Sequence, residues 1–406
     1  MIFLYIILNV ILIYYRIKPY DYNLSSMIGI WEGFLNLNPD FVDKGFVVYK
    51  SGGYDGQFFY LINQYLSGVS SQLPILDSFS VRFTRIGLPL LTSIFSKIFG
   101  TKAYPVITLA ILHLSHIMSF VMLKKLCKKE IRYLANFHLF SPFVINSNLL
   151  LLSDSLVCSW TIFIFYFLNQ KDCHKPAKIS VLLLLGCFFV LIKESALSIM
   201  GMLLLLLWLK RSYPPNSFSS SSVQILPPTG GSNETKSLLG LVGGSIIFYF
   251  AFVFYLRFFL DANPGTYPLT FLDLIDYPFF GFFKSISFST PMNLSPFVRE
   301  LAKYPIFIFY LLLLLNLRNI KTVQDFVWFL PILFILFTAG IAEQGYWLTY
   351  DNIMRMFTLS IPMIILYKNS KKSYNDFGIL WFGIVLLAML IVRILWLKKE
   401  MEFFFN

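Results

Sequence analysis

Residues Phe377 to Leu397 read FGILWFGIVLLAMLIVRILWL, a run of apolar side chains with a single charged residue, Arg393. A helix needs about 20 mostly apolar residues to cross a bilayer, and this run meets that requirement. Of all 406 residues, 57% are hydrophobic and 13% are charged, whereas a soluble domain has about 45–50% apolar and about 25% charged residues. The sequence therefore predicts a helical membrane protein.

Similar apolar runs follow one another along most of the chain. They are Met1 to Tyr15, Ala103 to Leu123, Tyr133 to Leu149, Leu150 to Gln170, Ile179 to Leu209, Ser237 to Leu260, Tyr304 to Leu317, Phe326 to Ala342 and Met354 to Tyr367, with Ile86 to Phe99 as an additional candidate. The run that contains Lys193 is expected to break there, because ionisable side chains are costly at membrane depth. We predict an all-α, polytopic integral membrane protein with roughly 9–12 transmembrane helices.

Three segments lack the apolar character of a span. Residues 16–85 are the longest, and we expect them to form a large first external loop. Residues 212–236 are rich in Ser, Pro and Gly, which predicts a flexible linker between an N-terminal membrane module (1–211) and a C-terminal one (237–406). Residues 261–303 combine prolines with many aromatic residues, which suits a loop at the membrane interface.

The charge distribution argues against a nucleic-acid partner. The net charge is +12, but the lysines and arginines fall in short clusters between the apolar runs, as at residues 124–132. Such clusters are typical of loops on the positive side of a membrane. The four cysteines show no CxxC spacing, so we expect free thiols and no zinc site. A composition rich in Phe, Ile, Lys and Asn is typical of AT-rich bacterial genomes and favours a bacterial inner membrane.

The first loop carries the residues best suited to chemistry. Asp55 lies between glycines in the sequence GGYDGQ of residues 52–57, and glycines allow a backbone to approach a ligand closely. Arg82 and Arg85 would share one helix face, and arginines bind phosphate oxygens in a bidentate manner. Together they predict a site for an anionic lipid head group, with Asp55 as proton acceptor. The alternatives are an ordinary turn at Asp55 and simple head-group anchoring by the arginines.

The segments YDGQFFYLI (residues 54–62) and VRFTRIGLPLL (residues 81–91) resemble the first external loop and the following arginine-rich segment of a bacterial, YDGQ-type group of GT-C membrane glycosyltransferases. In the same order, LSDSL (residues 152–156) resembles that group's serine–acidic helix start, and KESAL (residues 193–197) resembles its lysine–glutamate motif. The likeness covers residues 1–210. Beyond them, only TYDNIMRMFTLSIP (residues 349–362) looks familiar, as a late arginine before a proline-containing helix.

The resemblance implies an enzyme that transfers a sugar from a polyprenyl-phosphate-linked donor, with inversion, and that needs no cofactor. Asp55 would be the catalytic acidic residue. Arg82, Arg85 and Arg355 would bind the donor phosphate. The residues expected in the substrate cavity are Tyr54, Gln57, Asp154, Lys193 and Glu194. A glycan, a lipid-linked intermediate or a protein side chain would be the acceptor.

Several of these residues also have plain structural interpretations. Asp154 would suit the start of a helix, and Lys193 with Glu194 would suit a structural ion pair. The first-loop aromatics, Tyr54 among them, would suit an interfacial belt as well as a sugar-stacking surface.

We predict no metal. His113 and His116 share one apolar helix without an evident third ligand, and Asp273 and Asp276 are three apart in a proline-rich loop. We expect the histidines to serve polar packing within the bundle.

Three other functions remain open from the sequence. A transporter or flippase of lipid-linked sugars would also need membrane helices, internal charges and arginines, but it would show broken helices in corresponding halves. A noncatalytic scaffold would have no need of Asp55 and its arginines. A glycan polymerase or ligase would need a large late loop with an arginine or histidine site, for which residues 261–303 are a poor match because they contain only Arg299 and no histidine.

Overall fold

The structure, a computed structural model, describes residues 1–170, 176–212, 232–260, 275–286, 303–370, 378–397 and 401–406, together with Leu301. Regular structure in these residues is mostly helical, which confirms the all-α prediction. The helices are α1 (Ile2–Ile17), α2 (Glu32–Leu37), α3 (Gly56–Ser67), α4 (Phe79–Phe83), α5 (Gly87–Phe99), α6 (Tyr104–Leu126), α7 (Ala135–Leu139), α8 (Pro142–Asn148), α9 (Asp154–Leu168), α10 (Pro176–Ile192), α11 (Ser195–Ser212), α12 (Ser232–Phe258), α13 (Phe280–Ser285), α15 (Lys303–Asn316), α16 (Val323–Ile341), α17 (Gln344–Leu348), α18 (Tyr350–Met356), α19 (Ser360–Ser370) and α20 (Gly378–Val392). The strands are β1 (Ile30–Trp31), β2 (Val47–Tyr49) and β3 (Phe403–Phe405).

The apolar helices confirm a polytopic membrane protein. Within the described residues, six segments are long and apolar enough to cross a bilayer: Ile2–Tyr20, Thr101–Leu126, Ser195–Ser212, Thr235–Phe258, Val323–Ile341 and Gly378–Trp396. Gly87–Phe99, Asp154–Leu168 and Ala177–Ile192 are shorter apolar helices. The predicted break near Lys193 is confirmed, because α10 ends and α11 begins on either side of it.

Two predicted spans are each divided into two shorter helices. The run from Tyr133 to Leu149 becomes α7 and α8, and the run from Met354 to Tyr367 becomes α18 and α19. Pro142 and Pro362 lie in the first turns of α8 and α19. A proline lacks the amide hydrogen that would continue a preceding helix, so each helix starts anew there.

Apolar side chains cover the outside of the bundle as well as its core. On α12, Ile247, Phe250, Phe254 and Phe258 are each more than half exposed. An exposed apolar surface of this kind is unfavourable in water and suits contact with lipid tails.

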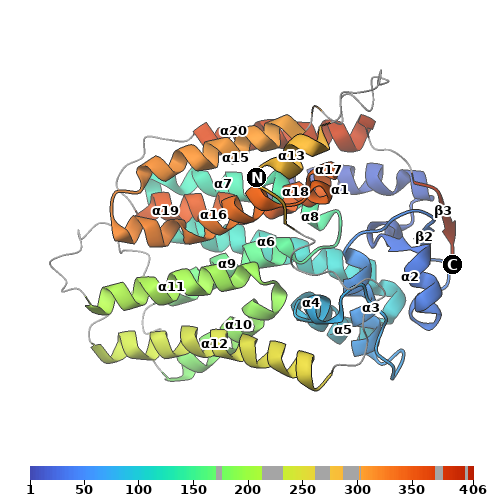
Figure 1. The fold of residues 1–406 in the computed structure, drawn as a ribbon, viewed down its shortest axis with the longest axis horizontal. Coiled ribbons are helices and arrows are strands. Elements are labelled where there is room, and N and C mark those ends of the chain that lie inside the picture. Colours follow the sequence, from blue (N-terminus) through green and yellow to red (C-terminus); the bar gives the residue numbers. More distant parts are fainter. Residues whose placement is uncertain are drawn as a thin grey trace.

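The long helices α11, α12, α16 and α20 run across the view in Figure 1, and the first-loop helices gather at one end of them. A small sheet also lies at this end. Strand β1 pairs with β2 in parallel, with Ile30 opposite Val48, and β2 pairs with β3 antiparallel, with Val48 opposite Phe404. The strand near the C-terminus is therefore part of the first-loop fold, a pairing that the sequence did not predict.

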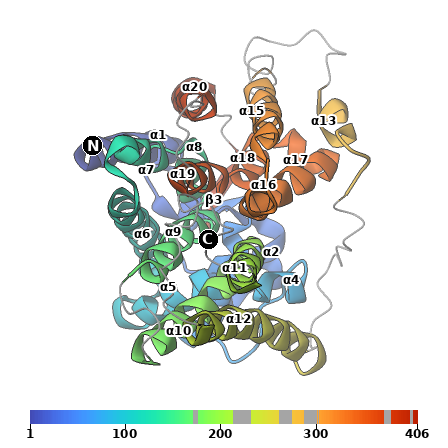
Figure 2. The same cartoon turned by 90° about the vertical axis from the view of Figure 1, so that its left-hand side faces the viewer.

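Figure 2, turned by 90° from Figure 1, shows α9, α10, α11 and α12 in the lower part of the bundle and α15, α16 and α20 in the upper part. Helices α7 and α8 pack against α20, and α11 packs against α16. The two predicted modules, 1–211 and 237–406, therefore share an interface. Of the predicted linker, residues 213–231 lie outside the described part of the chain, and its ends belong to α11 and α12. Most of the predicted interfacial loop, 261–303, also lies outside it.

Candidate functional site

Asp55 lies at the centre of three arginine side chains. Arg82 Nη1 is 3.2 Å from Asp55 Oδ1, and Arg85 Nη1 is 4.0 Å from Asp55 Oδ2. Arg355 Nη2 donates a hydrogen bond to Asp55 Oδ2. All four side chains are 11–19% exposed. We call these four residues the arginine cluster.

The backbone around Asp55 is held tightly in place. Asp55 immediately precedes α3, and a Cβ at Gly56 would lie 2.6 Å from the carbonyl oxygen of Ile28 and 2.9 Å from that of Leu150. Only glycine allows such a close approach of three backbone segments. Asp55 is therefore fixed where the first loop meets the turn before α9.

Two of the arginines are also held from their outer side. Arg82 Nε donates to Asp77 Oδ1 at 2.8 Å, and Arg85 Nε donates to the two Glu194 carboxylate oxygens at 2.8 and 3.0 Å. Charge-assisted bonds of this kind fix the plane of a guanidinium group. Arg82 and Arg85 thus present their remaining N–H groups toward Asp55 in a defined direction.

Lys193 and Asp154 form a second ion pair beside the arginine cluster. Lys193 Nζ donates to Asp154 Oδ1, and the Asp154 side chain is 5% exposed. Asp154 is the first residue of α9, and Lys193 lies in the break between α10 and α11. The whole group then has equal numbers of positive and negative side chains, so its formal charges balance. The cations are Arg82, Arg85, Arg355 and Lys193, and the acids are Asp55, Asp77, Asp154 and Glu194.

The electrostatics keep Asp55 ionised. Burial by itself would raise the pKa of the Asp55 carboxyl, but Arg355, followed by Arg82 and Arg85, holds that pKa well below its usual range. In the same way, Arg85 outweighs burial and lowers the pKa of Glu194. A carboxylate with a lowered pKa is a weak base.

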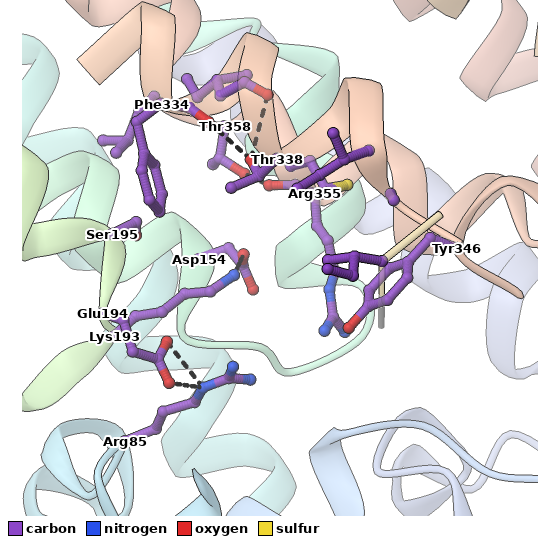
Figure 3. A pocket seen from close by; sticks show the side chains of 16 residues that line it. Arg85, Asp154, Lys193, Glu194, Ser195, Phe334, Thr338, Tyr346, Arg355 and Thr358 are labelled. Atoms are coloured by element: carbon purple, nitrogen blue, oxygen red, sulfur yellow. Dashed lines mark hydrogen bonds and ion pairs between the residues drawn. The ribbon is translucent and has the colours of Figure 1, made fainter. Parts of the chain in front are cut away.

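The arginine cluster lines a cavity of about 600 Å³, together with Glu194, Glu343, Tyr346 and Asn352. A second cavity of about 210 Å³ adjoins it, since Arg85, Glu194, Tyr346 and Arg355 line both. Figure 3 shows the second cavity, with Arg85, Asp154, Lys193 and Arg355 around it. Its remaining wall is largely apolar and includes Phe334, Ile335, Ile341 and Leu359. The charged side of the site is therefore continuous with an apolar surface in the second cavity.

The structure brings together seven of the nine predicted site residues and places Tyr54 and Gln57 elsewhere. The Tyr54 ring lies 5.6 Å from the Arg16 guanidinium, and its hydroxyl faces Met401 Sδ at 3.8 Å. Gln57 Oε1 accepts a hydrogen bond from the backbone N–H of Trp31. Neither side chain lines the two cavities, and both hold the first loop together.

Four residues of this region were not predicted as site residues from the sequence: Asp77, Glu343, Tyr346 and Asn352. A weak signal was available for Glu343, which lies two residues beyond the end of the apolar helix α16. A charge at the end of a span marks the membrane interface but does not say which cavity it faces.

No group of three or more His, Cys, Asp or Glu side chains in the described residues is arranged to hold a metal ion. His113 Nδ1 lies 2.9 Å from the hydroxyl of Tyr5, and His116 Nε2 lies 3.1 Å from the carbonyl oxygen of Leu139, as expected for polar packing.

Asp276 pairs with Lys284 at 3.4 Å. Asp273 and Cys173 lie outside the described residues, and Cys127, Cys158 and Cys187 are free thiols.

Comparisons with protein families and with curated proteins find no match. Among solved structures, the fold is similar to that of the oligosaccharyltransferase of Archaeoglobus fulgidus in two crystal structures. The apo form matches with a TM-score of 0.42 at 11% identity, and the form tethered through a disulfide bond to an acceptor peptide with the NVT sequon matches with 0.40 at 12%. Each match covers 98% of this chain and 56% of the other, so the chain spans little more than half the length of that enzyme. Likeness at these TM-scores establishes neither a family nor an activity, and the functional assignment rests on the site itself.

Proposed function

We propose that this chain is a GT-C-type membrane glycosyltransferase that transfers a sugar from a polyprenyl-phosphate-linked donor to an acceptor hydroxyl at the external membrane face. The observation that carries the proposal is the arginine cluster, in which three partly buried guanidinium groups converge on one carboxylate in a cavity with an apolar extension. The lipid bilayer and the donor are the expected partners, in a bacterial inner membrane.

The two adjoining cavities match the phosphate and the lipid tail of such a donor. Arg82, Arg85 and Arg355 offer several N–H donors to a phosphate, and the planar guanidinium fork suits phosphate oxygens. The apolar wall around Phe334 and Ile335 suits the first isoprene units of the tail. Asp154 and Lys193 line the smaller cavity beside Arg85 and Arg355.

The reaction would proceed as one displacement. The acceptor hydroxyl gives its proton to the Asp55 carboxylate, and its oxygen forms a bond to the anomeric carbon. The bond from that carbon to the phosphate oxygen breaks, and the electron pair leaves with the phosphate. A positioned base contributes about 10²–10⁴-fold to such a step, and the arginines stabilise the charge that grows on the leaving oxygens.

Donor binding and Asp55 basicity would be coupled in this site. A bound phosphate competes with Asp55 for the same three guanidinium groups. As these contacts pass from the carboxylate to the phosphate, the electrostatic cause of the low Asp55 pKa weakens. The base would therefore gain strength only after the donor has bound, which limits unproductive proton uptake by the empty site.

The test is sugar transfer by purified protein in nanodiscs from a panel of polyprenyl-phosphate sugars. Asp55→Asn should abolish transfer at matched folded yield, while Asp40→Asn, an exposed carboxylate of the same loop, should leave it unchanged. Equal transfer by Asp55→Asn would remove Asp55 from its role. A folded wild type that transfers no sugar but moves the lipid-linked sugar across liposome membranes would favour the alternative, a transporter or flippase.

A further inference from the structure

Glu343 is an acidic side chain that lines the larger cavity and has no ion-pair partner among the described residues. It lines the same cavity as Asp55, Arg82 and Arg355. Among the described residues, its carboxylate has no ion pair and no hydrogen bond. Glu343 occupies the position before α17, yet its side chain makes no capping bond to that helix. The carboxylate is therefore available to something that enters the cavity.

The backbone around Glu343 is closely packed, and its glycine neighbours leave room for this side chain. A Cβ at Gly345 would collide with Glu343 Oε1, and a Cβ at Gly281 would collide with the carbonyl oxygen of Ala342 and lie 2.8 Å from the carbonyl carbon of Glu343. Trp347 Nε1 donates to the carbonyl oxygen of Ala339 at 3.1 Å and ties α17 to α16. The backbone that carries Glu343 is thus closely packed against α13 and α16.

The cavity that Glu343 lines also contains uncharged polar side chains beside the arginine cluster. Tyr346 and Asn352 line the same cavity, and Figure 3 shows the Tyr346 ring beside the Arg355 side chain. A carboxylate, a phenol and a carboxamide can all bond to hydroxyl groups. This wall of the cavity therefore suits a ligand rich in hydroxyls.

Charge also disfavours an anionic ligand at this wall. The three arginines of the cluster and Lys193 already face four acidic side chains, and Glu343 adds a further negative charge. A donor phosphate adds more. A second phosphate would meet an excess of like charge in a partly buried site, where such repulsion is poorly screened.

We propose that Glu343 is the acceptor-binding carboxylate and that the acceptor is an uncharged, hydroxyl-bearing glycan, not a phosphate-bearing lipid-linked intermediate. This inference rests on the proposed glycosyltransferase function and assigns the second substrate of the same cavity. The acceptor hydroxyls would hydrogen-bond to Glu343, which orients one of them toward the anomeric carbon.

The test uses octyl glycosides of glucose, galactose, mannose and N-acetylglucosamine as acceptors, each with and without a 6-phosphate group. Wild type should prefer the uncharged form of its acceptor by tenfold or more. Glu343→Gln should raise the acceptor KM about 10- to 100-fold, the range expected for losing a hydrogen bond to a charged group. It should also reduce the ratio of transfer to the uncharged glycoside over transfer to the phosphorylated one. Donor KM should stay unchanged. Glu130→Gln, the same change at an exposed site, is the control.

A second variant separates the position of the carboxylate from its charge. Gly345→Ala should displace the Glu343 side chain and raise the acceptor KM, while Gly201→Ala, where an added Cβ meets nothing, should not. An unchanged acceptor KM in Glu343→Gln, or better transfer to the phosphorylated glycosides, would overturn the proposal while leaving the glycosyltransferase function intact. If wild type transfers no sugar to any glycoside, thermal shifts of wild type and Glu343→Gln with the same glycosides decide whether Glu343 binds the uncharged form.

Discussion

Asn in place of Asp55 would leave three guanidinium groups facing one another without their shared carboxylate. Arg82 and Arg85 would retain Asp77 and Glu194, but Arg355 would lose the acid to which it donates. Removing one partner of a buried ion pair costs about 3–5 kcal/mol, because the remaining charge stays buried without compensation. The partial exposure of Asp55, 19%, places the expected loss toward the lower end of that range.

The second replacement in a double-mutant cycle should then restore part of the stability. Arg355→Gln removes the guanidinium group that Asp55→Asn leaves uncompensated, so the double variant should be more stable than Asp55→Asn alone. Contacting residues show coupling energies of about 0.5–3 kcal/mol, and we expect a value in the upper half of that range.

Thermal unfolding of the four proteins in one detergent, followed by tryptophan fluorescence, measures this coupling. Asp55→Asn should lower the apparent Tm by a few degrees, and the added Arg355→Gln should raise it again. If the stability losses of Asp55→Asn and Arg355→Gln simply add in the double variant, the two side chains do not stabilise each other. That result, or an Asp55→Asn variant as stable as wild type, would refute the reasoning.

Two further predictions concern the same region. Asp154→Asn should cost about 3 kcal/mol, because it leaves the Lys193 ammonium buried without its partner, and adding Lys193→Met should recover part of that loss in the same unfolding assay. The lowered pKa of Asp55 stabilises the fold at any pH above the value of about 3.9 for an unfolded Asp, and this contribution is lost as the pH falls below it. The apparent Tm of wild type should therefore fall between pH 5 and pH 3 more steeply than that of Asp55→Asn, and parallel curves would contradict this origin.

The membrane class and the outline of the first loop were predictable from the sequence because both depend on local properties. Apolar runs of about 20 residues reflect burial in lipid wherever they occur. The interruption at Lys193 predicted a helix break, which the structure places between α10 and α11. Arg82 and Arg85 were expected to act with Asp55, and the structure brings all three into contact.

Other features depend on contacts between distant parts of the chain. Strand β3 joins the first-loop sheet from the far end of the sequence, and Asp77 binds Arg82 from a loop without regular periodicity. The assignment of Tyr54 to a substrate cavity followed from the YDGQ resemblance. In the structure, its side chain lies against Arg16 instead, because successive residues before a helix point in different directions.

The sequence by itself determined that this protein is a multispan helical membrane protein with a charged, glycine-containing first loop. Hydrophobicity and glycine placement are properties of short segments, so a short window reveals them. Only the tertiary structure decided which charges meet: Arg355 reaches Asp55 across 300 residues, and Glu343 lines the same cavity without an ion pair to any described residue. Ion-pair partners are selected by the packing of whole helices, and no local pattern in the sequence encodes that packing.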